Sequence, residues 1–292
     1  MTTAGADVQI TDLAVDDHAC LTFGEPEELF DLTAAFVRDG LAGGLKVVWV
    51  TEAGPQRATP ELARRGVPVE SALADGQMTV AGCEDCLLPG QAFSAGEAMR
   101  WLSEQMAASR QHGFSGLRIA MDMNWALRPV SGVEELPEFE EGMAAALAGT
   151  TASVLCQYDR ERFDPVTLAT VAPFHTRSVA AATYYADALL RICRQYAPPG
   201  IRVAGEIDYR REEPLALALA EAIRLGGDIV VNMSALVFVD ARCTLMIADA
   251  ARTVASQSRQ VTLRCLPEVA TGFKRIGLAD LDGIRLVADG DR

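Results

Sequence analysis

Residues 228–254 decide how the second half of this chain folds, and they read DIVVNMSALVFVDARCTLMIADAARTV. The β-branched apolar run at residues 229–231 continues to Val239, which predicts a buried strand. After Asp240 the apolar residues recur with a period near 3.6, which is typical of an amphipathic helix. The Asp240 carboxylate can accept from the first N–H groups of that helix as its N-cap. The stretch therefore predicts a strand that leads through an exposed turn into a helix N-terminus, which suits an anion or a partner's acceptor group.

The flanking segments continue the alternation of strands and helices. Residues 201–208, 260–265 and 284–287 predict further strands, whereas residues 213–226 and 268–276 predict helices. This order is typical of an α/β sandwich in which the helices lie largely on one side of a mixed sheet.

The strand, the turn and the alternation resemble the STAS domain, the fold of anti-sigma factor antagonists, over about residues 199–288. In that family the strand ends in an Asp-Ser-Ser-Gly-like turn, and a partner kinase phosphorylates the first Ser. The matching residues here are Asp240, Ala241, Arg242 and Cys243. The resemblance implies that this turn binds an anti-sigma factor or a related kinase-fold regulator. Because Ala241 has no hydroxyl, this chain lacks the family's usual phosphorylatable Ser.

The first half predicts an open parallel sheet with helices between its strands. Continuous apolar runs predict strands at residues 20–23, 47–50, 117–121 and 152–158. Residues 27–39 and 93–112 have the spacing of amphipathic helices, and strand–helix–strand order implies right-handed crossovers. The acidic run at residues 134–141 predicts the start of a further helix, because negatively charged side chains stabilise a helix N-terminus.

This order resembles the core of RecA-like ATPases, in which the first strand leads into a phosphate loop of the form GxxxxGK[ST]. The corresponding residues 24–31 read GEPEELFD. Phe30 stands where a lysine would reach the phosphates, and the three glutamates would repel a triphosphate. We therefore expect a RecA-like parallel sheet with flanking helices that lacks a P-loop. A RecA-like nucleotide-binding ATPase is the alternative.

An ordered set of motifs over residues 17–183 resembles the MEDS domain, a sensory domain of regulators in methanogens and methylotrophs. The motifs are an early His beside a short strand, the helix end FVRDGL, the strand end DMNW, the segment LCQYDRERFDP and a late His. The resemblance implies sensing of a small hydrocarbon derivative rather than catalysis.

Seven side chains are predicted at or near strand ends and adjacent loops, where open parallel sheets bind ligands. These candidate ligand-binding residues are His18, Cys20, Asp122, Trp125, Cys156, Tyr158 and His175. They can converge on a mostly apolar pocket, and two His with two Cys can also bind a soft metal ion or contact haem iron. The competing interpretation is structural, since Cys in an apolar strand is usually a small core residue. We assign no metal ligand from the sequence, leave the cofactor unknown, and keep a haem or metal sensor as an alternative.

The sequence predicts no catalytic residue and thus no enzyme. The motifs GxSxG and GxGxxG are absent, and three His residues leave little room for a Ser-His-Asp system. The pair Cys83 and Cys86 stands alone, whereas structural zinc takes four ligands.

Charge and composition limit the location and the partners. The net charge is −14, and residues 1–197 carry 14 basic and 27 acidic residues, which disfavours binding to nucleic acid or anionic lipid. No apolar run approaches the ~20 residues that cross a bilayer, and no secretory signal opens the chain. The seven scattered Cys fit a reducing compartment. We expect a cytoplasmic protein.

The domain boundary is placed at the segment Ala197-Pro198-Pro199-Gly200, which is predicted to end a helix over residues 183–196. This gives a MEDS-like sensory domain in residues 1–197 and a STAS domain in residues 198–292. Together they predict a bacterial signal-transduction protein of transcription regulation. A small hydrophobic ligand would bind the first domain and control partner binding by the second.

Overall fold

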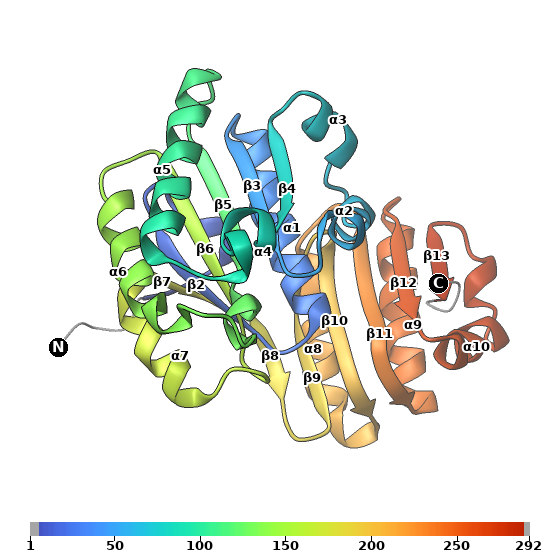
Figure 1. The fold of residues 1–292 in the computed structure, drawn as a ribbon. Coiled ribbons are helices and arrows are strands. Elements are labelled where there is room, and N and C mark those ends of the chain that lie inside the picture. Colours follow the sequence, from blue (N-terminus) through green and yellow to red (C-terminus); the bar gives the residue numbers. More distant parts are fainter. Residues whose placement is uncertain (1–5, 289–292) are drawn as a thin grey trace. The chain divides into compact units, whose positions relative to one another are not determined.

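The structure, a computed structural model, describes residues 6–288. The chain forms two compact units, Met1–Ala180 and Ala181–Arg292. Each unit has its own sheet and its own helices (Figure 1). The expected α/β class is therefore confirmed for both halves.

Over the described part of the first unit, seven strands form one sheet in the order β1-β7-β2-β6-β5-β3-β4, and every pair is parallel. The strands are β1 (Ala6–Val8), β2 (His18–Phe23), β3 (Lys46–Thr51), β4 (Met78–Gly82), β5 (Leu117–Asp122), β6 (Ala152–Asp159) and β7 (Arg177–Val179). The central strands β5 and β6 bury nearly every residue, because helices cover both faces of the sheet. The continuous apolar runs in the sequence reflect this two-sided burial.

The helices of this unit are α1 (Pro26–Ala42), α2 (Pro55–Arg64), α3 (Val69–Ala74), α4 (Cys83–Cys86), α5 (Ala95–Gln111), α6 (Leu136–Leu147) and α7 (Pro165–Val171). Short 3-10 turns lie at η1 (Ile10–Asp12), η2 (Pro89–Gln91), η3 (Met123–Leu127), η4 (Val133–Glu135) and η5 (Ala172–Phe174). Helices α5 and α6 pack on one face through Leu102 and Phe139, which share a core with Ile119 and Val154. Helix α1 covers the other face, where Nη1 of Arg118 donates to the Phe36 carbonyl at 2.9 Å.

In the second unit, as far as it is described, six strands form a mixed sheet in the order β13-β12-β11-β10-β9-β8. The strands are β8 (Thr183–Ala186), β9 (Leu190–Tyr196), β10 (Pro199–Ile207), β11 (Ile229–Val239), β12 (Val261–Cys265) and β13 (Ile284–Ala288). The helices are α8 (Glu212–Arg224), α9 (Ala241–Ser256) and α10 (Pro267–Arg275), with 3-10 turns η6 (Tyr209–Arg211) and η7 (Leu278–Asp280). One core joins all three helices to one face of the sheet, and Leu215, Ile247 and Phe273 represent α8, α9 and α10 in it. The predicted STAS-like sandwich is confirmed.

The helix predicted over residues 183–196 is wrong. The segment forms the hairpin β8–β9, and β9 pairs antiparallel with β10. Asp187 shapes the turn, since its carboxylate accepts from the N–H groups of Leu189 and Leu190, each at 2.8 Å. Pairing with β10 on one side and with β8 on the other provides partners for the backbone of β9, and this outweighs a helical spacing of apolar residues. The second unit consequently begins at Ala181, before the predicted boundary.

Candidate functional site

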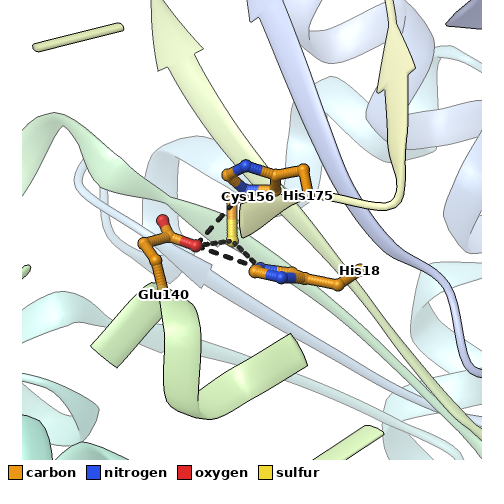
Figure 2. A group of neighbouring side chains, drawn as sticks. All are labelled: His18, Glu140, Cys156 and His175. Atoms are coloured by element: carbon orange, nitrogen blue, oxygen red, sulfur yellow. Dashed lines mark hydrogen bonds and ion pairs between the residues drawn. The ribbon is translucent and has the colours of Figure 1, made fainter. Parts of the chain in front are cut away.

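Four side chains from four separate segments meet in the interior of the first unit, and we call them the His–Glu–Cys cluster: His18, Glu140, Cys156 and His175 (Figure 2). The Oε2 atom of Glu140 lies 3.0 Å from Nε2 of His18 and 3.2 Å from Nε2 of His175. The Sγ atom of Cys156 lies 3.4 Å from Nε2 of His18 and 3.7 Å from Oε2 of Glu140. These four atoms all lie within 4.8 Å of one another.

The fold places these side chains through the pairing of β2 with β6. In that register His18 lies opposite Val154, and Cys20 lies opposite Cys156. Because side chains alternate along a strand, His18 and Cys156 point to the same face of the sheet. Glu140 reaches that face from α6, and His175 follows η5 just before β7.

Backbone carbonyls fix which ring nitrogen of each histidine faces the cluster. The Nδ1 atom of His18 lies 3.1 Å from the Phe174 oxygen, and that of His175 lies 3.0 Å from the Val171 oxygen. A carbonyl oxygen only accepts, so both Nδ1 atoms carry hydrogen and donate. In the neutral imidazoles both Nε2 atoms therefore direct lone pairs toward Glu140.

The cluster is sealed from solvent, with three residues fully buried and His175 only 3% exposed. Burial lowers the pKa of His18, which favours its neutral form. Burial also raises the pKa of Glu140, but the two histidines outweigh burial and hold that pKa below the ordinary range. The histidines lower the pKa of the Glu140 carboxyl through charge and through hydrogen bonds, whereas burial of His18 works against a positive charge on that ring. The buried Glu140 carboxylate therefore requires a positive charge beside it.

Two further predicted residues border the cluster. The Tyr158 hydroxyl donates to Oε1 of Glu140, the carboxylate oxygen that does not face the histidines. Cys20 is buried beside Cys156, and burial together with Glu140 raises the pKa of its thiol to about 12. Tyr158 therefore orients the carboxylate, whereas Cys20 remains a protonated thiol next to it.

Asp122 and Trp125 are not brought to the cluster. The Asp122 carboxylate accepts from the N–H groups of Asn124 at 3.0 Å and Glu52 at 3.2 Å, and so fixes the backbone after β5. Trp125 is fully buried, with its ring centroid 4.3 Å from that of Phe93. Both residues hold the carboxyl end of β5 in place.

Glu140 was missed because it belongs to an acidic run that predicted only a charged helix start. The missed signal is its position on the helix. Glu140 shares the buried face of α6 with Leu136, Phe139, Met143 and Leu147, at the spacing of the apolar stripe. A charged residue at such a position is buried, and a buried charge needs a partner.

A cleft of about 530 Å³ lies one layer of side chains away from the cluster, between the start of α6 and α7. Its lining is mostly apolar and includes Leu127, Val133, Leu136, Pro137, Phe163, Val166 and Val171. Two of these residues also contact the surroundings of the cluster. Val171 accepts from His175, and the ring of Phe163 packs edge-on against Tyr158 with centroids 5.1 Å apart.

In the second unit, the predicted N-cap is confirmed, since Oδ1 of Asp240 accepts from the N–H of Cys243 at 2.7 Å. Ala241 and Arg242 are exposed, and the Arg242 guanidinium pairs with Glu212. Cys243 is fully buried in the core, so its side chain does not reach a partner. Of the four predicted partner-binding residues, the turn therefore presents the first three.

Two hydroxyls near this turn already donate within the chain. The Ser234 hydroxyl donates to Oδ1 of Asn232 at 2.8 Å, and the Thr244 hydroxyl donates to the Asp240 carbonyl at 2.7 Å. Neither stands at the position of the family's phosphorylated Ser.

Exposed apolar side chains flank the same turn. Val237 is 64% exposed, Phe238 51% and Leu245 49%. The strand β12 pairs with β11 only as far as Met233, so the described chain leaves that edge of β11 unpaired between Met233 and the turn. We call Val237, Phe238, Asp240, Arg242 and Leu245 the β11–α9 surface.

Over residues 6–288, no helix has the length and apolar character required to cross a bilayer.

Comparisons with known proteins agree with this division of the chain. The family model described as "MEthanogen/methylotroph, DcmR Sensory domain" (MEDS) matches residues 17–176, and the STAS domain model matches residues 196–288. The predicted order, a MEDS domain followed by a STAS domain, is thereby confirmed. The transcriptional repressor DcmR of Methylorubrum extorquens is 28% identical over 150 residues, which cover 51% of this chain and 54% of the repressor. The chain thus matches about half the length of that curated relative.

Among solved structures, a KaiC-like protein from Pyrococcus horikoshii OT3 is similar with a TM-score of 0.44 and 14% identity. The similarity covers 65% of this chain and 79% of that structure.

Proposed function

We propose that this chain, which belongs to the MEDS family, couples the sensing of a small apolar molecule to the binding of a protein partner by its STAS domain. The two domains and the likeness to a transcriptional repressor make it a regulatory protein. Our proposal adds that it acts in the bacterial cytoplasm, that it is not an enzyme, and that its partner is an anti-sigma factor or a related kinase-fold regulator.

The β11–α9 surface carries the proposal for the partner. Neighbouring exposed apolar side chains with charged residues between them are typical of protein interaction sites. Here Val237 and Phe238 are both more than half exposed at the end of a strand with an unpaired edge. Asp240 and Arg242 supply charges of both signs beside them, which favours a partner with a complementary polar rim.

The usual phosphate switch is missing at this surface, because Ala241 has no hydroxyl. Control of partner binding therefore falls to the sensory domain. A sensed molecule shifts the population of the partner-binding state only if it binds that state and the alternative with different affinities.

Substitution at the β11–α9 surface tests the partner. We expect the double variant Val237→Asp, Phe238→Asp to recover at least tenfold less of the specific partner from a lysate of the source organism, because buried carboxylates would have no pairing groups at the interface. The matched control is Leu217→Asp in α8, since Leu217 is 65% exposed in the same domain but outside this surface. Binding is then measured with the purified partner. Equal recovery by the double variant and by the control would refute the proposal.

The cleft between α6 and α7 supports the sensing of a small apolar molecule, because its volume and lining are typical of small-molecule sites. Val166 lines it and is 75% exposed, so Val166→Arg places a charge at its mouth without disturbing the core. We expect this variant to lose the chemical-shift changes that small alcohols, thiols or haloalkanes cause in the parent. Leu73→Arg, on exposed Leu73 outside the cleft, should retain them.

The proposal that the chain is not an ATPase is supported at the start of α1. The N–H of Gly24, which would face a phosphate in a P-loop, donates instead to Oε2 of Glu28 at 3.0 Å. A carboxylate thus takes the place that an anionic ligand would need. Calorimetric titration with ATP checks this, and tight magnesium-dependent binding would overturn it.

A further inference from the structure

We propose that His18, Glu140, Cys156 and His175 together bind one divalent transition-metal ion of the zinc class in a closed, four-coordinate site. The assignment rests on the geometry of the first unit alone and is independent of the sensed molecule and of the protein partner.

Four of the six distances between the donor atoms lie close to those of tetrahedral coordination. With Zn–N and Zn–O bonds of about 2.1 Å and a Zn–S bond of about 2.3 Å, tetrahedral donors lie about 3.4 Å apart for N and O and about 3.6 Å apart where sulfur is involved. In this chain the two N–O separations are 3.0 and 3.2 Å, the N–S separation from His18 is 3.4 Å and the O–S separation is 3.7 Å, and the two remaining separations, both from Nε2 of His175, lie within 4.8 Å. A single ion therefore reaches all four atoms with little movement of the side chains.

Hydrogen bonding within the chain does not account for the cluster. Both Nδ1 hydrogens are used by backbone carbonyls, so with neutral imidazoles, the form that burial favours, the two Nε2 atoms and Oε2 of Glu140 converge as acceptors. The Cys156 thiol offers one hydrogen, which can serve only one of them. The Nε2 atom of His175 makes no hydrogen bond in residues 6–288, although Oε2 of Glu140 lies 3.2 Å from it. A metal ion accepts a lone pair from every one of these atoms and removes the conflict.

Charge balance leads to the same ion. A thiolate and a carboxylate carry two negative charges, and a divalent cation with two neutral imidazoles makes the site neutral. A neutral assembly is what full burial of these residues requires. Imidazole and thiolate donors select zinc, or iron of the same charge, rather than magnesium or calcium.

The supporting contacts are those of metal sites. Each histidine donates its distal N–H to a backbone carbonyl, and Glu140 accepts from the Tyr158 hydroxyl through the oxygen that faces away from the histidines. Such contacts fix the ligand orientations before the metal binds.

The donor set also limits what the ion can do. Four protein ligands leave no open position for water or substrate, so this site stabilises or senses and does not hydrolyse. Haem does not fit, since Glu140 and Cys156 occupy the space beside the histidine Nε2 atoms that a porphyrin plane would need (Figure 2).

The first test uses the unaltered full chain, expressed with zinc and iron in the medium and purified without chelator. Elemental analysis should find about one zinc or iron per chain, as expected for a buried structural site. The metal-free chain, prepared by unfolding with chelator and refolding, should regain one equivalent of Co²⁺ and show the intense absorption of a thiolate–cobalt bond and of tetrahedral geometry.

Two variants and one control locate the ion. Cys156→Ser and Glu140→Gln keep the size of the side chains, and each should lower the metal content at least tenfold, since even second-layer changes cost ten- to a hundredfold in affinity. Cys20→Ser changes an equally buried thiol on the neighbouring strand and should keep both the metal and the cobalt spectrum. If a variant fails to fold, the thiolate–cobalt band of the parent and of Cys20→Ser still shows whether the chain binds the ion through a thiolate other than Cys20.

Two results would overturn the proposal. If neither the native nor the refolded chain holds zinc, iron or Co²⁺, protons bridge the cluster and no metal site exists. If Cys156→Ser keeps the thiolate–cobalt band, the ion is bound elsewhere.

Discussion

Replacing Tyr158 by Phe removes one hydroxyl and leaves the rest of the site in place. The aromatic ring still packs against Phe163, but Oε1 of Glu140 loses its hydroxyl donor in a fully buried position. A hydrogen bond to a charged group contributes about 1.5–3 kcal/mol. Because each 1.36 kcal/mol is a factor of ten, this corresponds to roughly a ten- to hundredfold loss, which is divided between the stability of the metal-free chain and its metal affinity.

The assay follows from the positions of the aromatic residues. All three tryptophans, Trp49, Trp101 and Trp125, lie in the first unit, so their fluorescence during urea unfolding reports that unit alone. Metal affinity is measured by competition with a chromophoric chelator. Tyr185→Phe is the matched control, because Tyr185 donates to Asp187 in the second unit. If Tyr158→Phe is as stable as the control and binds metal equally well, the hydroxyl does not support Glu140 and the reasoning fails.

Three further substitutions test the second unit. Asp240→Ala should cost about 0.5–2 kcal/mol by loss of the N-cap to Cys243. Burial raises the pKa of Asp240, but the N–H groups that the carboxylate accepts from lower the pKa overall, so the cap contributes its full stability above the ordinary Asp pKa of about 3.9. In urea unfolding, the difference in stability between parent and variant should therefore vanish as the pH falls through the lower pKa of the folded state. A difference that persists in acid would contradict this. Gly205→Ala should cost more than about 1–3 kcal/mol, since φ is +101° and the added Cβ would lie 2.0 Å from the Leu189 carbonyl oxygen; unchanged circular-dichroism melting would show that the hairpin relaxes freely. Phe273→Ala should cost about 3–5 kcal/mol because the ring is fully buried, and calorimetry should show the loss in the transition that tryptophan fluorescence does not report.

The central strands of both sheets could be predicted, because burial on one or both faces produces a continuous or alternating pattern of apolar residues. The run at residues 152–158 is continuous because β6 lies between β2 and β5 with helices on both faces. The end of β11 could be predicted because Asp240 both stops the strand and caps α9. In each case a local pattern and the tertiary structure require the same residues.

The hairpin β8–β9 could not be predicted from its own residues, because its apolar positions fit a helix as well as a strand. Leu190, Ile192 and Cys193 are buried through pairing with β10, which comes later in the chain. The signal that was available is the Asp187 turn, since an Asp between two short apolar runs often bonds to the backbone two residues on.

In the His–Glu–Cys cluster, too, the sequence indicates the residue types, but only the tertiary structure brings the residues together. His18, Cys156 and His175 were candidates because their residue types carry chemistry, but their meeting depends on the parallel order β7-β2-β6. Glu140 joins them only because α6 directs that carboxylate inward, at a position on the buried face of the helix where an apolar side chain is expected. Sequence reasoning that treats an acidic run as one solvated surface overlooks the single member that is buried.

The cluster and the cleft share structural elements, and this gives the metal proposal a consequence for sensing. Glu140 lies one turn beyond Leu136 on α6, which lines the cleft, and His175 donates to Val171, which lines it from α7. A metal ion that holds Glu140 and His175 together therefore fixes the separation of α6 and α7, which line the cleft. A molecule that enters the cleft and moves α7 against α6 must also change the angle between two metal ligands. The cobalt spectrum of the parent should then shift when small haloalkanes or alcohols bind, and the shift should disappear in Val166→Arg. Binding in the cleft with an unchanged spectrum would show that the two sites act separately.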